Sequence, residues 1–231
     1  MLASRIQRFG GPEVIELTDL ARPAAGKGEV LVRVAAAGVG PWDAWVRSGK
    51  SIIEQPLPLT LGSDISGRIA AVGPEVHGFL PGQEVYGVTN ERFTGGYAEY
   101  AVASANSIAL KPHRLSFVEA ASLPVAAVTA QQMLFDHAQL QPGEQVLIHG
   151  VGGSVGSFAL QMARGVGAHI VGTDRGPGAE YASPAARRHG NLSTRARYDR
   201  RAASTVRACR RRFTAHSGGR RLAALRSSGR S

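Results

Sequence analysis

A glycine-rich segment, GVGGSVG at residues 150–156, is the part of this sequence best suited to hold a phosphate group. Glycine has no side chain, so a pyrophosphate can come close to the backbone, and the first amides of a helix attract negative charge. A strand-like run at residues 145–149 precedes the segment, and apolar residues at helical spacing follow it. The alternative is a glycine turn that only tightens a strand–helix junction. The pattern predicts dinucleotide binding by Gly150, Gly152, Gly153, Ser154, Val155 and Gly156.

An acidic residue completes this motif. Asp174 ends the strand expected at residues 169–173 and lies 18 positions after Gly156, close to the ~20 typical of a carboxylate that binds ribose hydroxyls. Thr173 and Asp174 are therefore assigned to the cofactor as well. Asp174 would repel the 2′-phosphate of NADP, whereas the neighbouring Arg175 would attract it. The expected cofactor is NAD or NADP, with Asp174 favouring NAD.

Charge and cysteine content limit other chemistries. Cys209 is the one cysteine of the sequence, which excludes an internal disulfide and a four-cysteine zinc site. The net charge of +10 is uneven, because residues 1–174 hold 12 basic and 15 acidic side chains whereas residues 175–231 hold 15 and 2. No run approaches the ~20 apolar residues of a membrane span. The sequence thus predicts a soluble, cytoplasmic protein.

Short strands dominate the first half of the sequence. Runs at residues 28–34, 65–72, 84–88 and 97–102 are rich in β-branched or aromatic residues, and glycine or proline turns separate them. Several short strands at this spacing favour a barrel-type β domain over a helical one.

The pattern changes to helical after this β-rich part. SFVE at residues 116–119 is typical of a capping box, and helical sequence continues to about His137. A strand–loop–helix–strand unit follows at residues 145–174. The expected fold class is therefore α/β (α+β), with a β-barrel-type domain at residues 1–115 and an incomplete parallel-sheet dinucleotide-binding domain at residues 116–181.

Residues 182–231 form a tail rich in arginine, serine and alanine. Large apolar residues are few there, so burial cannot offset the entropy of ordering the backbone, and we expect disorder. The alternative is a basic arm for nucleic acid or a membrane surface. Tyr198 and Phe213 are too few to supply the aromatic residues that nucleic-acid-binding segments interleave with basic ones. The tail therefore does not predict a nucleic acid or membrane partner.

Six segments carry ordered motifs, at residues 61–67, 72–76, 95–100, 115–121, 123–130 and 142–161. Together they resemble the zinc-free quinone oxidoreductase branch of the medium-chain dehydrogenase/reductase family. The resemblance implies a GroES-like domain and a Rossmann domain, with the active site in the cleft between them. It also implies hydride transfer between nicotinamide and a quinone, enone or carbonyl substrate, and the homodimers typical of the family.

The resemblance bears on the reacting centre too. Zinc-dependent members have a cysteine at the position of Gly40 and a His-Glu pair at Ser63 and Asp64, so no zinc is expected here. The asparagine that zinc-free members usually show is also absent at Gly40. The resemblance places Asp43 in the cleft and Thr129 near the nicotinamide, as the candidate catalytic residues. The alternatives are a cap for a helix starting just after Asp43, and a core position for Thr129.

A complete family member would continue through further Rossmann strands, so the resemblance implies a truncated or frameshifted chain. Our hypothesis is a frameshift, because codons for residues 186–190 can spell the family-like LGATE when they are read one base later. The gene sequence tests this, and an unshifted reading frame would contradict it. A folded but inactive remnant is a further alternative.

Overall fold

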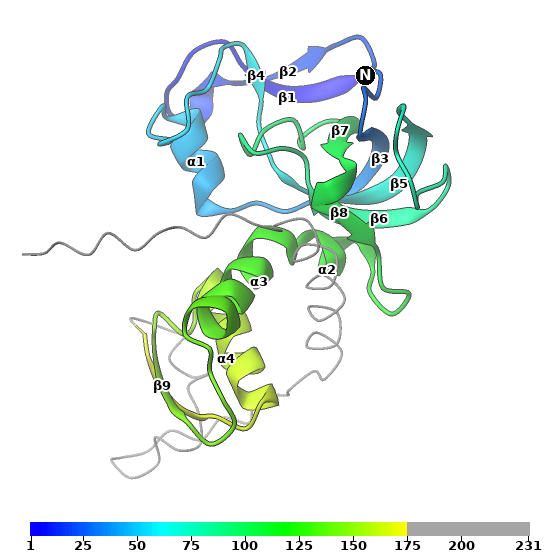
Figure 1. The fold of residues 1–231 in the computed structure, drawn as a ribbon. Coiled ribbons are helices and arrows are strands. Elements are labelled where there is room, and N and C mark those ends of the chain that lie inside the picture. Colours follow the sequence, from blue (N-terminus) through cyan, green and yellow to red (C-terminus); the bar gives the residue numbers. More distant parts are fainter. Residues whose placement is uncertain (175–231) are drawn as a thin grey trace, which may run out of the picture.

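The computed structural model describes residues 1–174, and the β-rich first part of this region contains two sheets (Figure 1). The larger sheet is antiparallel with the order β7-β3-β5-β6-β8, and the smaller has the order β2-β1-β4. The expected barrel-type domain is thus built from two sheets. Its strands are β1 (Leu2–Ile6), β2 (Ile15–Asp19), β3 (Glu29–Ala37), β4 (Leu59–Thr60), β5 (Asp64–Val72), β6 (Glu84–Val88), β7 (Tyr100–Ser104) and β8 (Ile108–Leu110).

Branched apolar side chains fill the core of the larger sheet. Val30 and Val32 of β3, Ile65 and Ile69 of β5 and Val85 of β6 are all at most 2% exposed. Burial of such side chains is the main favourable contribution to folding. A second cluster packs the smaller sheet against α1 (Pro41–Arg47), and its members are Ile6, Val14, Val46, Leu59 and Leu61.

Helix α1 begins earlier than the sequence predicts. A start just after Asp43 is expected, but Gly40 is the N-cap and Pro41 is the first helical residue. Proline suits this position because its ring fixes φ and a first-turn amide needs no helical partner. Asp43 still caps the helix, since its Oδ2 accepts the N–H of Gly40 at 2.7 Å.

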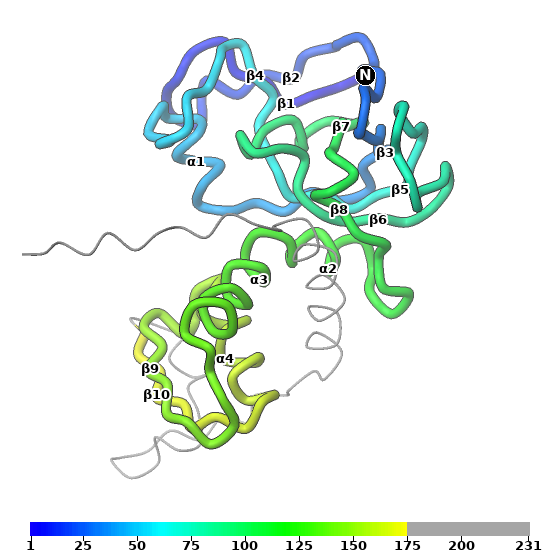
Figure 2. Tube along the Cα trace, viewed as in Figure 1, coloured from blue at the N-terminus to red at the C-terminus, as the bar shows by residue number. Residues whose placement is uncertain are grey.

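Helices and a two-stranded parallel sheet form the second part of the described region. The predicted capping box is confirmed, because Ser116 Oγ accepts the N–H of Glu119 and Glu119 Oε2 accepts the N–H of Ser116. The strands at residues 145–149 and 169–173 also match their predicted bounds, and Figure 2 shows them side by side. The elements are α2 (Phe117–Ala121), α3 (Pro124–Gln131), a π-helix (Gln132–His137), β9 (Gln145–His149), α4 (Ser154–Gly165) and β10 (His169–Thr173).

The apolar face predicted for α4 is confirmed. Ala159, Met162 and Ala163 are buried and belong to one cluster with Ile148 of β9 and Ile170 of β10. This cluster continues through α3, so the strand–loop–helix–strand unit rests on a packed core.

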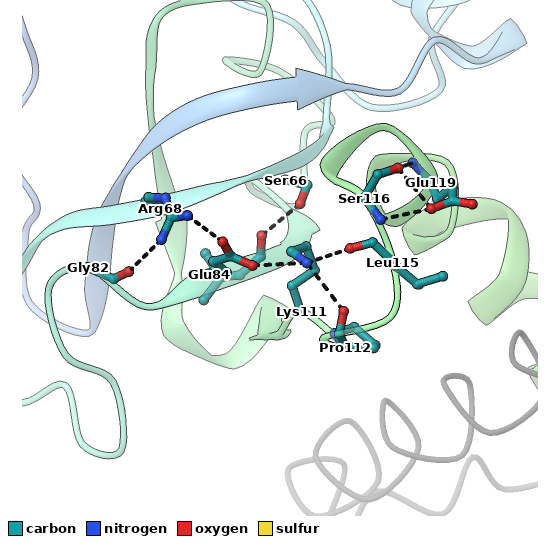
Figure 3. A network of polar contacts seen from close by, with 10 residues as sticks. Ser66, Arg68, Gly82, Glu84, Lys111, Pro112, Leu115, Ser116 and Glu119 are labelled. Atoms are coloured by element: carbon teal, nitrogen blue, oxygen red, sulfur yellow. Dashed lines mark hydrogen bonds and ion pairs between the residues drawn. The ribbon is translucent and has the colours of Figure 1, made fainter.

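Lys111 fixes the connection between the two parts (Figure 3). Its buried Nζ pairs with Glu84 Oε2 at 2.9 Å and donates to the carbonyl oxygens of Pro112 and Leu115. Lys111 is also the main cause of a lowered pKa at Glu84. A buried ammonium needs such partners because it loses its hydration. The link from β8 to α2 is therefore tied to β6.

The predictions for residues 175–231 lie outside the described residues. They are the end of the second domain at residue 181, the disordered tail with its basic-arm alternative, and the frameshift.

Candidate functional site

The glycine-rich loop forms a tight turn between β9 and α4. Gly150 has a φ of 73°, in the left-handed region that favours glycine. A Cβ on Gly156 would lie 2.1 Å from the carbonyl oxygen of Gly150, so the turn and the first turn of the helix are in backbone contact. Gly153 is the N-cap of α4, which begins at Ser154. Gly150 and Gly153 therefore add no side chain next to the backbone of this helix start.

The end of β10 is bound to this loop. The amides of Gly150 and Val151 donate to the carbonyl oxygen of Thr173 at 2.7 and 3.1 Å. The Thr173 hydroxyl also lies 2.8 Å from Nδ1 of His149, and Asp174 follows directly. The structure thus brings the predicted cofactor-binding residues of the loop together with those at the end of the second strand.

A cavity of about 650 Å³ lies beside the loop. Its walls come from α3, the π-helix, β9 and the start of α4, and Thr129 stands at its border. The cavity is lined by Thr129, Met133, Leu134, Ala138, Val146, Leu147, Ile148, His149, Gly150, Gly153, Val155, Gly156 and Ala159.

A second, smaller cavity of about 200 Å³ lies between β6 and α3. Thr129 borders it as well, so this half-buried residue contacts both cavities. The Thr129 hydroxyl donates to the carbonyl oxygen of Val125 at 2.7 Å, and its oxygen remains able to accept. The small cavity is lined by Tyr86, Gly87, Val88, Phe93, Pro124, Val125, Val128, Thr129 and Gln132.

Asp43 lies in a buried polar group at the edge of the β-rich part. Its Oδ2 accepts the hydroxyl of Tyr97 at 2.9 Å, and its buried Oδ1 has no hydrogen-bond partner among the described residues. Burial raises the pKa of Asp43, and burial together with this carboxylate raises the pKa of Tyr97. The sequence predicts a strand from residue 97, but β7 starts at Tyr100. Tyr97 lies before the strand, and its hydroxyl is hydrogen-bonded to Asp43.

Asp64 is a second buried carboxylate and is not among the predicted site residues. It is 3% exposed, and its Oδ1 accepts the amide of Val125 at 2.7 Å while Oδ2 accepts the hydroxyl of Ser63 at 2.9 Å. Burial, only partly offset by these hydrogen bonds, raises its pKa to about 6, and Asp43 adds to the increase. An aspartate at the head of an apolar strand is the sequence signal that indicates it.

Comparison with known proteins shows which proteins this chain resembles. An alcohol dehydrogenase GroES-like domain matches residues 26–113. Human quinone oxidoreductase is 41% identical over 174 residues, which cover 75% of this chain. Over these residues the chain is similar to quinone oxidoreductases. It spans about half the length of the curated relatives it matches, with 52% of the human protein covered.

Solved structures agree with a quinone oxidoreductase-like fold. An alcohol dehydrogenase superfamily protein from Novosphingobium aromaticivorans matches with a TM-score of 0.72 and 41% identity, over 78% of this chain and 55% of that one. Escherichia coli quinone oxidoreductase, solved as an NADPH complex, matches with a TM-score of 0.72 and 27% identity over the same shares. The predicted α/β class, with a GroES-like domain before Rossmann-type elements, is confirmed.

At Gly40, where zinc-dependent family members have a cysteine, a neighbouring aromatic ring fills the space beside the backbone. A Cβ on Gly40 would lie 2.2 Å from the indole ring of Trp42, so that ring occupies the space of a larger side chain. Within residues 1–174 no group of three or more His, Cys, Asp or Glu side chains is placed to hold a metal. The helices of the same region include none long and apolar enough for a membrane span.

Proposed function

We propose that this chain binds a nicotinamide dinucleotide at residues 150–156 and reduces a small quinone, enone or carbonyl compound. The observation that carries the proposal is the pair of hydrogen bonds from the amides of Gly150 and Val151 to the carbonyl oxygen of Thr173. These bonds join the glycine turn, and with it the start of α4, to the end of the strand that Asp174 follows. The close contact of Gly156 with Gly150 fits this role, because only glycine lets the start of α4 pack this tightly against the turn, as the third glycine of a dinucleotide-binding motif does. The bound cofactor would supply the hydride.

The residues of the loop have distinct parts in this proposal. The amides of Gly150, Val151 and Gly153 already donate to backbone carbonyl oxygens. The amides of Gly152 and of the first turn of α4, from Ser154 to Gly156, would therefore hold the pyrophosphate, and the positive end of α4 would stabilise its charge. Thr173 and Asp174 accept hydrogen bonds from the ribose hydroxyls. The negative charge of Asp174 favours NAD over NADP, because it repels a 2′-phosphate. We also propose the domain boundary at residues 115 and 116, next to the Lys111 contacts.

Thr129 and Asp43 are the proposed catalytic residues. Thr129 borders both cavities, so its hydroxyl is suited to orient the nicotinamide or the substrate oxygen. Asp43 has a spare buried acceptor atom and a raised pKa, which suit it to hold a proton that balances the hydride. This reaction requires no zinc, and the Ser63–Asp64 hydrogen bond occupies groups at the position where zinc-dependent members have ligands.

The direct test is cofactor oxidation by the full chain. NADH and NADPH absorbance is followed with a panel of quinones and enones, before and after treatment with a metal chelator. Turnover that survives the chelator supports the proposal. Cofactor binding without turnover favours an inactive remnant instead, a reading that the exposed pair Leu147 and Val171 on the two-stranded sheet also supports.

Replacing Asp174 is expected to change cofactor preference. Asp174→Ser removes the charge that repels a 2′-phosphate, so the dissociation constant for NADPH should fall about tenfold relative to that for NADH, which corresponds to about 1.4 kcal/mol. Fluorescence titration with both cofactors measures the ratio. Glu16→Ser, on the exposed face of β2, makes the same charge change far from the loop and should leave the ratio unaltered. If both variants changed this ratio equally, Asp174 would not be part of the cofactor site.

A further inference from the structure

Asp64 reaches from the β-rich part to the start of helix α3. Its Oδ1 accepts the amide of Val125, 61 positions away in sequence, at 2.7 Å. The N-cap of α3 is Leu123, which has no side chain able to cap, and Pro124 has no amide hydrogen. Asp64 therefore provides the acceptor that the helix start lacks.

The carboxylate is itself held firmly. The Ser63 hydroxyl binds Oδ2 at 2.9 Å, and the amide of Gly38 donates to the Asp64 carbonyl oxygen at 2.9 Å. A Cβ on Gly38 would lie 2.5 Å from the carbonyl oxygen of Ala121 and 2.9 Å from Cβ of Asp64. Strand β5, the end of β3 and helix α2 thus meet at close backbone contact around this group.

The capped helix carries the candidate reaction site. Val125, which Asp64 binds, accepts the Thr129 hydroxyl at 2.7 Å one turn later. Val125, Val128 and Thr129 line the small cavity between β6 and α3. A continuous chain of hydrogen bonds therefore leads from Ser63 through Asp64 and Val125 to Thr129.

We propose that Asp64 is a positioning residue, which fixes the start of α3 against the β-rich part and so holds Thr129 and the small cavity in place for the cofactor. This inference rests on the proposed function for its catalytic consequence. Its structural content, an anchored helix start, stands independently of turnover.

The charged surroundings of Asp64 agree with a dedicated role. Asp43 of α1 and Tyr97 before β7 are the titratable groups that interact with it, and neither is basic. Among residues 1–174 Asp64 has no ion pair. A buried carboxylate without a cation is costly, and its hydrogen bond to Val125 is the contact that offsets part of that cost.

The test compares Asp64→Ala, Asp64→Asn and Ile69→Val in the full chain. Asp64→Ala removes the acceptor, Asp64→Asn retains an oxygen for Val125, and Ile69→Val weakens the same strand by about 0.5–1.5 kcal/mol without touching α3. Hydrogen exchange is measured in peptides covering residues 123–131, and NADH and NADPH affinities are measured by fluorescence. We expect Asp64→Ala to speed exchange about tenfold or more and Asp64→Asn to exchange no faster than the wild type.

The outcomes are separable. Faster exchange in Asp64→Ala but not in Ile69→Val, with weaker cofactor binding restored by Asp64→Asn, supports the proposal. Equal exchange in Asp64→Ala and Ile69→Val overturns it, whatever the activity. A wild-type chain that binds neither cofactor contradicts the proposed function instead, and the exchange rates alone then decide whether Asp64 anchors α3.

Discussion

Replacing Gly156 with alanine should abolish dinucleotide binding and destabilise the second part of the described region by about 3 kcal/mol or more, at the upper end of the costs of overpacking. The added Cβ would lie 2.1 Å from the carbonyl oxygen of Gly150 and 2.8 Å from Cα of Val151. Both neighbours are backbone atoms, so no rotamer change relieves the contact. Only a displacement of the loop or of α4 makes room.

The loop has little freedom to move. Gly150 is held to Thr173 by a 2.7 Å hydrogen bond, and Val151 is fully buried in the core that contains α4. An alanine at residue 156 must therefore break either the bond to β10 or the packing of the helix. Both losses separate the amides proposed to bind pyrophosphate from the end of β10, so binding and stability should fall together.

Gly153→Ala is the matched control for stability. The nearest atom to its added Cβ is the Gly150 oxygen, 3.2 Å away, and its φ of −74° is open to any residue. Alanine is a poorer N-cap than glycine, so a loss of about 1 kcal/mol or less is expected. Urea unfolding gives both free energies, and hydrogen exchange shows whether the loss is local. Equal stabilities for the two variants would contradict the contact argument.

Local patterns predicted several elements with their bounds. The strands at residues 84–88, 145–149 and 169–173 appear as predicted, because each is a short apolar run that glycine or proline limits. The capping box at residues 116–119 also follows from local chemistry alone. In these segments propensity, turn chemistry and burial all favour the same structure.

Features that depend on contacts between residues far apart in the chain could not be predicted from the sequence. Asp43 caps its helix from within the first turn and not from before it, and it also accepts the hydroxyl of Tyr97, 54 positions away in sequence. The Asp64–Val125 bond spans 61 positions and crosses from a strand to a helix of the other part. No periodicity reports such a pair, since each partner alone looks like an ordinary strand or helix residue. The packing of Trp42 over Gly40 is equally invisible to residue spacing.

Asp64→Asn should raise the free energy of unfolding at pH 7.5 by up to about 3 kcal/mol and have little effect near pH 4. The pKa of Asp64 is about 6 in the folded chain against 3.8 for an ordinary aspartate, mainly because of burial. The folded state thus binds a proton more tightly than the unfolded state. The resulting stability is present below pH 3.8 and is lost as the pH rises through 6. Asparagine does not ionise, so the variant avoids this loss.

Unfolding curves in urea between pH 4 and pH 7.5 measure the difference. Asp43 also has a raised pKa, so a smaller decline in the same direction should remain in the variant. Asp19→Asn is a control of opposite sign: its exposed carboxylate pairs with the N-terminal amine, which lowers its pKa and gives stability that is lost as the pH falls.

Wild-type and Asp64→Asn stabilities that stay parallel across this range would mean that Asp64 does not titrate there in the folded chain. The burial of an unpaired charge would then be fully compensated by the Val125 amide and the Ser63 hydroxyl. The expected result has a different implication. Asp64 would then lower the stability of the folded chain at neutral pH even though asparagine could accept the same amide, so the stability of the fold does not explain the carboxylate.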